Sequence, residues 1–195
     1  MKNIFKFMGI ALMACSLTVA CGDKDNENDN EGGEGGGNTT TTSVSVNFNG
    51  QNQGTMNSIQ AAYNANYAVC VFDFFAEAQT FPGVEIYLNS SANGQSTATY
   101  DVSSMNLTGG DCAICEFYES TSLRDGDGLT YGDWWAAEAN SNVTAMDLTN
   151  LKASFTVNAT MFWALEAYVE EAGQVGYDAA TRAPMTVAAS NITLQ

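Results

Sequence analysis

Histidine is absent from this chain of 195 residues, and proline occurs only twice. Without imidazole, the chain cannot form the Ser-His-Asp or Cys-His arrangements of nucleophilic catalysis, nor a metal site that uses histidine ligands. An enzyme would have to rely on carboxylates, on thiols, or on an activated lysine or tyrosine. We therefore expect a protein that is not an enzyme and that needs no cofactor.

Basic residues are also scarce, because six lysines and arginines stand against 22 acidic residues and give a formal net charge of −16. Nucleic acid is excluded as a partner, since its phosphates must be neutralised by lysine and arginine. Direct adhesion to an anionic membrane surface is disfavoured for the same reason. A strongly acidic chain favours solubility and the attraction of cations.

The chain has no apolar run long enough to cross a bilayer. The uncharged run over residues 7–20 is about 14 residues long, whereas a membrane-spanning helix needs roughly 20. Two lysines precede this run and the small residue Ala20 ends it, a pattern typical of a secretory signal peptide over residues 1–20. Cys21 follows at once, as in the lipobox of bacterial lipoproteins, where the thiol is acylated.

Two cysteines compete for the lipid. Cys15 follows its own lipobox-like string, but it would leave a shorter apolar run and an apolar tail after the cut. Cys21 is followed directly by acidic, glycine-rich sequence and is the preferred site. Residues 21–42 lack large apolar side chains, so they cannot offset the entropy of folding and are expected to form a disordered tether. We expect a protein anchored to the outer membrane by its lipid and facing the cell surface or the periplasm.

Residues 43–195 are expected to fold as one all-β domain. Short alternating apolar segments recur there between turn residues, without a βαβ rhythm, which indicates an antiparallel β-sandwich of about 9–11 strands. A closed up-and-down β-barrel is the alternative. The segments expected to form strands are 44–48, 67–75, 84–88, 96–102, 112–118, 131–137, 142–148, 152–157, 161–169 and 185–194.

Cys112 and Cys115 form the most specific local string of the domain, Asp-Cys-Ala-Ile-Cys. A redox-active pair belongs at the start of a helix, whereas this context predicts a strand flanked by acids. A structural disulfide fits an exported protein better. Residues i and i+3 of a straight strand face opposite sides, so a Cys112–Cys115 bridge demands a bend. Cys70 is the rival partner for either cysteine, and we favour the Cys112–Cys115 pairing slightly.

Two other groups are weak ligand candidates. Trp134 and Trp135 are adjacent in an expected strand, so at least one of them leaves the main core and could face a carbohydrate. Asp125, Asp127 and Asp133 alternate with glycines like part of a Ca²⁺ loop, but the closing glutamate of an EF-hand is missing.

The run from residue 111 to residue 118, the acidic loop after it, and the segments 135–145 and 151–155 resemble uncharacterised secreted lipoproteins of Gram-negative bacteria of the Bacteroidetes and myxobacterial type, which carry an Asp-Cys-x-x-Cys motif. The likeness covers about a third of the domain. Those proteins often hold a second cysteine pair in the loop, and its absence here fits a bridge between Cys112 and Cys115. The resemblance implies a fold and a location but no activity.

The function expected from the sequence is that of a lipid-anchored cell-envelope protein, a non-catalytic binding or structural module. The alternative is a surface lipoprotein that binds a carbohydrate or Ca²⁺, and a protein ligand is equally compatible with the sequence. A hydrolase that uses paired carboxylates is the remaining alternative.

Overall fold

The computed structural model describes residues 41–77, 80–119, 132–165, 177–178 and 180–195. The chain divides into two units, Met1–Thr39 and Thr40–Gln195, and the second holds the described residues. Within these residues the regular structure is almost entirely strand. The strands are β1 (Ser43–Phe48), β2 (Gln51–Asn52), β3 (Ser58–Asn64), β4 (Val69–Glu77), β5 (Thr80–Asn89), β6 (Gly94–Asp101), β7 (Asn106–Thr108), β8 (Cys112–Tyr118), β9 (Gly132–Asp147), β10 (Lys152–Leu165) and β11 (Arg182–Thr193).

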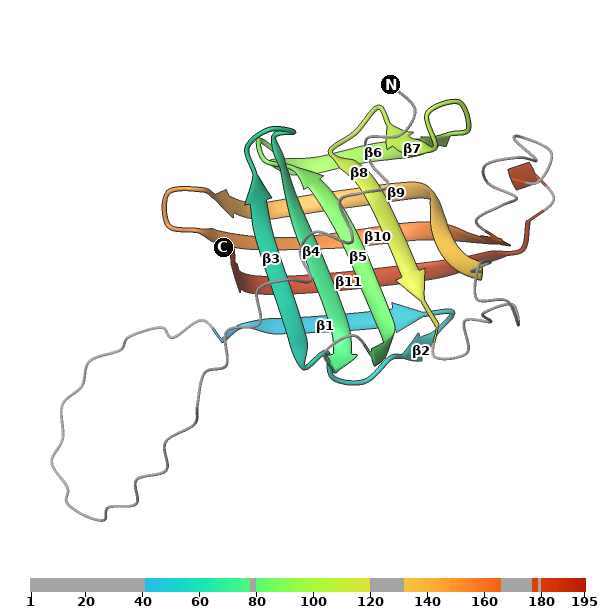
Figure 1. Ribbon diagram of the computed structural model, residues 1–195, viewed down its shortest axis with the longest axis horizontal. Coiled ribbons are helices and arrows are strands. Elements are labelled where there is room, and N and C mark those ends of the chain that lie inside the picture. Colours follow the sequence, from blue (N-terminus) through green and yellow to red (C-terminus); the bar gives the residue numbers. More distant parts are fainter. Residues whose placement is uncertain (1–40, 78–79, 120–131, 166–176, 179) are drawn as a thin grey trace, which may run out of the picture. The chain divides into compact units, whose positions relative to one another are not determined.

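All strand pairs are antiparallel and belong to one sheet in the order β2-β1-β11-β10-β9-β8-β5-β4-β3. The sheet folds over on itself, so that β3, β4, β5 and β8 form one layer that crosses the layer of β1, β11, β10 and β9 (Figure 1). The β6–β7 hairpin adds to β9. The all-β antiparallel prediction is confirmed. The two layers are continuous halves of a single curled sheet. This architecture is intermediate between the predicted sandwich and the barrel that was its alternative.

Two connections join the layers at their edges. The first is the short β8–β9 pairing, which consists of Glu116 opposite Trp135 and Phe117 opposite Trp134. The second is made by the last residue, because the Gln195 N–H donates to the Ala61 carbonyl at 2.9 Å and its carbonyl accepts from the Tyr63 N–H at 3.3 Å. These backbone hydrogen bonds satisfy part of the β3 edge, which would otherwise be open to another chain.

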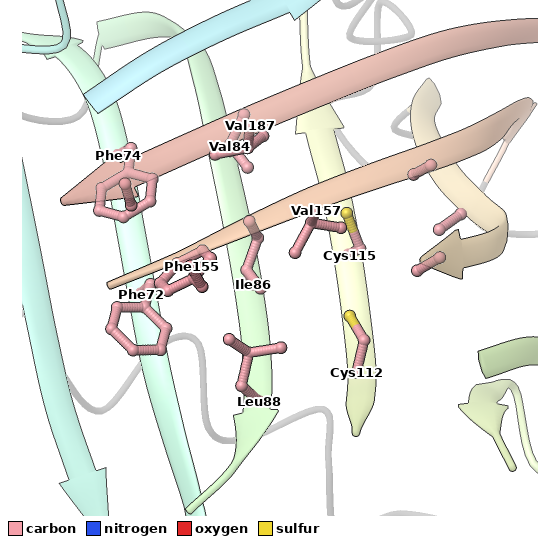
Figure 2. Close-up of a cluster of buried hydrophobic side chains, with 14 of the residues drawn as sticks. Phe72, Phe74, Val84, Ile86, Leu88, Cys112, Cys115, Phe155, Val157 and Val187 are labelled. Atoms are coloured by element: carbon pink, nitrogen blue, oxygen red, sulfur yellow. The ribbon is translucent and has the colours of Figure 1, made fainter. Parts of the chain in front are cut away.

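The core lies between the two layers and is filled by the inward residues of both (Figure 2). Phe155 of β10 is central, with its ring 4.6 Å from that of Phe72 on β4, in an edge-to-face arrangement that aromatic pairs prefer. Near the β8–β9 connection, Phe48 of β1 stacks on Phe117 of β8 at 4.3 Å between centroids. Alternation in β4 and β5 therefore places every second residue in this core and its neighbours on the outer face, and β8 follows the same alternation from Cys115 onward.

Several strand boundaries differ from those expected. β3 was not among the expected segments, because Ser58–Asn64 contains only two large apolar side chains and two alanines. β9 and β10 are each one long strand where the sequence predicted two. Bulges at Ala137 and Thr144 let β9 bend without ending, and the polar residues between them pair with β10 on one side and with β6 on the other.

Within the described parts of the chain, no helix is both long and apolar enough to cross a bilayer.

Candidate functional site

Three carboxylates stand side by side on the outer face of β4, β5 and β8. The strand register places Asp73 opposite Glu85, and Glu85 opposite Glu116. Each acid lies between two core residues of its strand, so all three side chains point away from the core. We call Asp73, Glu85 and Glu116 the acidic row.

The acidic row is bordered by aromatic side chains. On one side, Phe75 and Tyr118 flank Gly83, with ring centroids 6.1 Å apart and rings nearly parallel. The Phe75 ring covers Gly83 so closely that a Cβ at this position would lie 2.2 Å from the ring. Glycine at 83 therefore makes room for the ring. Phe81, which is 43% exposed, lies beyond Tyr118 at 6.2 Å between ring centroids.

Tyr118 ties two of the acids together. Its hydroxyl oxygen lies 2.8 Å from Glu116 Oε2 and 3.1 Å from Glu85 Oε2, so its proton is donated to this pair of carboxylates. Tyr87, the next outward residue of β5 after Glu85, is almost completely buried. Burial, followed by the nearby charge of Glu85, raises the pKa of the Tyr87 hydroxyl far above its ordinary value.

Asp73 has the least favourable surroundings of the three acids. Its Oδ1 atom is buried and has no hydrogen-bond partner. Burial, and to a smaller extent the neighbouring Glu85 charge, raise the pKa of the Asp73 carboxyl from 3.8 to about 7. Like charges placed directly opposite each other on neighbouring strands destabilise a sheet. The acidic row is therefore a feature that folding stability does not explain.

Beyond Glu116, the line of the acidic row continues across the sheet to Trp135. This residue of β9 is directly opposite Glu116, and it packs with Tyr100 and Phe162 in a second apolar cluster outside the main core. The Glu116 charge also acts on Tyr100, after burial as the main cause, and raises the pKa of that hydroxyl. Both the Trp135 Nε1 and the Tyr100 hydroxyl are buried without a hydrogen-bond partner.

The two tryptophans predicted as ligand-binding residues thus lie on opposite faces of β9. Trp134 packs against the main core, with its ring 4.9 Å from that of Phe48, and its buried Nε1 also has no partner. Trp135 faces outward and extends the acidic row. Both side chains are half-buried.

The Ca²⁺ candidates lie almost entirely outside the part of the chain that the structure describes. Asp125 and Asp127 lie outside the described residues, and for Asp133 only its backbone pairing with Ala164 is described. Among the residues that the structure describes, no three Cys, Asp or Glu side chains converge as a metal site requires. Cys21 and its alternative Cys15 also lie outside the described residues.

Cys70, Cys112 and Cys115 are free and buried in the structure, so the predicted bridge is not formed there. Both cysteines of the Asp-Cys-Ala-Ile-Cys string nevertheless face the core (Figure 2). The register explains this, because Leu88 of β5 is opposite Cys112 while Tyr87 is opposite Ile114. Ala113 is therefore an extra residue in β8, and this bulge supplies the bend that the pairing demands.

The acidic row was not predicted from the sequence. The available signal was a single acid enclosed by core-type residues in three strands: Phe-Asp-Phe, Val-Glu-Ile and Cys-Glu-Phe. Such a pattern predicts an outward acid, but it does not show that the three acids meet.

A scan against models of protein families, a search of curated proteins and a search of solved structures each gave no match.

Proposed function

We propose that this chain is a lipid-anchored cell-envelope protein that binds a carbohydrate ligand, without transforming it, on the outer face formed by the acidic row, Tyr118 and Trp135. The observation that carries this proposal is the alignment of unpartnered polar atoms with carboxylates. Asp73 Oδ1 and Trp135 Nε1 lack partners at the two ends of one line across the strands, and the Tyr100 hydroxyl lacks one in the cluster that Trp135 joins. Buried polar atoms without partners are rare and need an explanation.

A sugar matches the chemistry of this face. Carboxylates accept strong hydrogen bonds from hydroxyl groups, and aromatic rings offer apolar faces to the C–H groups of a sugar ring. No charge on the ligand is required. Of the two basic side chains that the structure describes, Lys152 donates to Thr193, and Arg182 stacks on Phe162 and Tyr177 in the cluster that Trp135 also joins.

Removing two of the carboxylate charges is expected to weaken sugar binding. The double variant Glu85→Gln/Glu116→Gln should bind at least about tenfold more weakly, because each lost hydrogen bond to a charged group accounts for about 1.5–3 kcal/mol. Affinity electrophoresis of the full chain against a panel of soluble neutral polysaccharides would measure this. Glu138→Gln is the control, since Glu138 is exposed on β9, away from the row. Unchanged migration of the wild type in every polysaccharide would contradict a carbohydrate ligand.

Acylation is expected to depend on Cys21. In a Gram-negative host that is fed an alkyne-tagged fatty acid, the Cys21→Ser variant should lose both the label and its recovery in the membrane fraction. The reason is that the acyl chains supply the membrane affinity of an otherwise acidic chain. Cys15→Ser is the matched control and should keep both. If Cys15→Ser loses the label instead, the anchor is at the other cysteine.

A further inference from the structure

The Ala113 bulge brings two thiols into line on one side of β8. Ile86 of β5 is opposite Cys115 and Leu88 is opposite Cys112, so the two cysteines are opposite residues only two positions apart. At a rise of about 3.4 Å per residue, their Cα atoms are about 6.8 Å apart, at the upper end of the range that a disulfide spans. A straight strand would place residues i and i+3 about 10 Å apart on opposite faces.

The two side chains also interact. The Cys112 thiol donates to the Ile114 carbonyl at 3.2 Å. A hydrogen bond with Cys112 and complete burial raise the pKa of the Cys115 thiol well above its ordinary value. Figure 2 shows both side chains on the same side of β8, facing the core.

Cys70 cannot take part in such a bond. It is opposite Leu88, which is in turn opposite Cys112, so the whole of β5 lies between the two cysteines. Two strand spacings amount to about 9.5 Å, and a disulfide does not join Cα atoms more than about 7 Å apart. Cys115 is farther from Cys70 still, because it is opposite Ile86, two residues along β5 from Leu88. The register therefore eliminates both pairings of Cys70 that the sequence left open.

We propose that Cys112 and Cys115 are joined by a disulfide across the Ala113 bulge in the exported protein, and that Cys70 remains a free thiol. The inference rests on the proposed envelope location, where disulfides persist. The bond fixes the bulge, and the bulge sets which residues of β8 face the core. It therefore holds Glu116 in line with Glu85.

The oxidant is the disulfide of an exported thiol–disulfide oxidoreductase. One cysteine thiolate attacks a sulfur of that disulfide, which forms a mixed disulfide and releases the other oxidoreductase sulfur as a thiolate. The second cysteine then attacks the mixed disulfide, and the oxidoreductase leaves with two electrons and with both sulfurs reduced. The two protons lost by the cysteines are taken up by these sulfurs. Because the folded thiols are buried, the reaction precedes the packing of β8 into the core.

The test is alkylation of the full chain from membranes, denatured with N-ethylmaleimide present and without reductant. After chymotrypsin digestion, mass spectrometry should find Cys70 alkylated, and the peptide holding Cys112 and Cys115 unmodified and lacking two hydrogens. Both should become alkylated after reduction. Cys70→Ala should keep the bridge, whereas Cys112→Ser should leave Cys115 alkylated without reductant. Because the alkylation of the thiols is measured in denatured protein, variants that fold poorly still give a usable result.

A second arm separates the bridge from the location. The full chain is reduced, denatured and refolded in a mixture of reduced and oxidised glutathione, which supplies the oxidant wherever the protein resides in the cell. The bridge is expected here too, because the strand register brings the sulfurs together. Recovery of the protein in the cytosol would overturn the location alone. Free Cys112 and Cys115 in both arms, or a bond to Cys70, would overturn the bridge.

Discussion

Replacement of Asp73 by asparagine is expected to stabilise the folded protein above pH 7 by about 2–4 kcal/mol. The Asp73 carboxyl has a pKa of about 7 in the folded chain against an ordinary value of 3.8. Each unit of this difference is about 1.36 kcal/mol, and the lower figure allows for the partial exposure of the side chain. The main cause is burial, and the charge of Glu85 adds to it.

The sign of the pH dependence follows from proton linkage. The folded state binds the Asp73 proton more tightly than the unfolded chain, so its contribution to stability is complete below about pH 4. It is then lost as the pH rises to about 7. Urea unfolding of wild type and Asp73→Asn at pH 4, 6 and 8 should therefore show a gap that widens with pH. Equal gaps at all three pH values would contradict the burial of this carboxyl.

Asp147→Asn is the control, because the sign of its effect is opposite. The Asp147 carboxylate accepts hydrogen bonds from the Thr149 and Asn150 backbone N–H groups, both at 2.9 Å, and from the Asn150 side chain at 2.6 Å. These hydrogen bonds lower the pKa of the Asp147 carboxyl, and the one from the Asn150 side chain has the largest effect. Its contribution is thus present above its unfolded pKa and lost as the pH falls. The Asn variant should lose stability at neutral pH.

Replacement of Phe155 by alanine is expected to destabilise the domain by about 3–5 kcal/mol, the usual cost of removing a fully enclosed aromatic side chain. The Phe155 side chain is 2% exposed and contacts the rings of Phe72 and Phe74 from the opposite layer. Its loss leaves a cavity between two sheet layers that the hydrogen-bonded strands cannot close. Chemical denaturation monitored by circular dichroism would measure the change.

Phe81→Ala provides the matched comparison for this prediction. The chemical change is the same, but the Phe81 side chain is 43% exposed at the border of the acidic row. Its effect on stability should stay within about 0.5 kcal/mol, as for most surface substitutions. If both variants lost the same stability, the core would not lie between the two layers.

The strand class followed from the sequence, because alternation acts over a few neighbouring residues. In β8, the order Cys-Glu-Phe is a local signal for an acid facing away from the core, but this signal was not used. β3 was not predicted as a strand, because its inward residues are the small Ala61 and the half-buried Ile59. Its place in the sheet comes from pairing with the strongly apolar β4, which is a contact between segments.

The acidic row and the paired thiols depended on the tertiary structure for a related reason. Asp73, Glu85 and Glu116 belong to three separate strands, and only the register makes them neighbours. A shift of one residue would turn an acid toward the core, so the register is determined by packing of the whole layer.

The amino-acid sequence alone therefore determined the composition-based exclusions, the expected export signal and the all-β architecture, since charge, missing residue types and local periodicity are properties of the chain itself. The tertiary structure decided that one sheet curls into two layers, that Trp135 rather than Trp134 joins the acidic row, and that Cys70 is out of reach of Cys112. The physical reason is that bulges and register arise from the packing of segments far apart in the chain, and no short stretch of sequence contains that information.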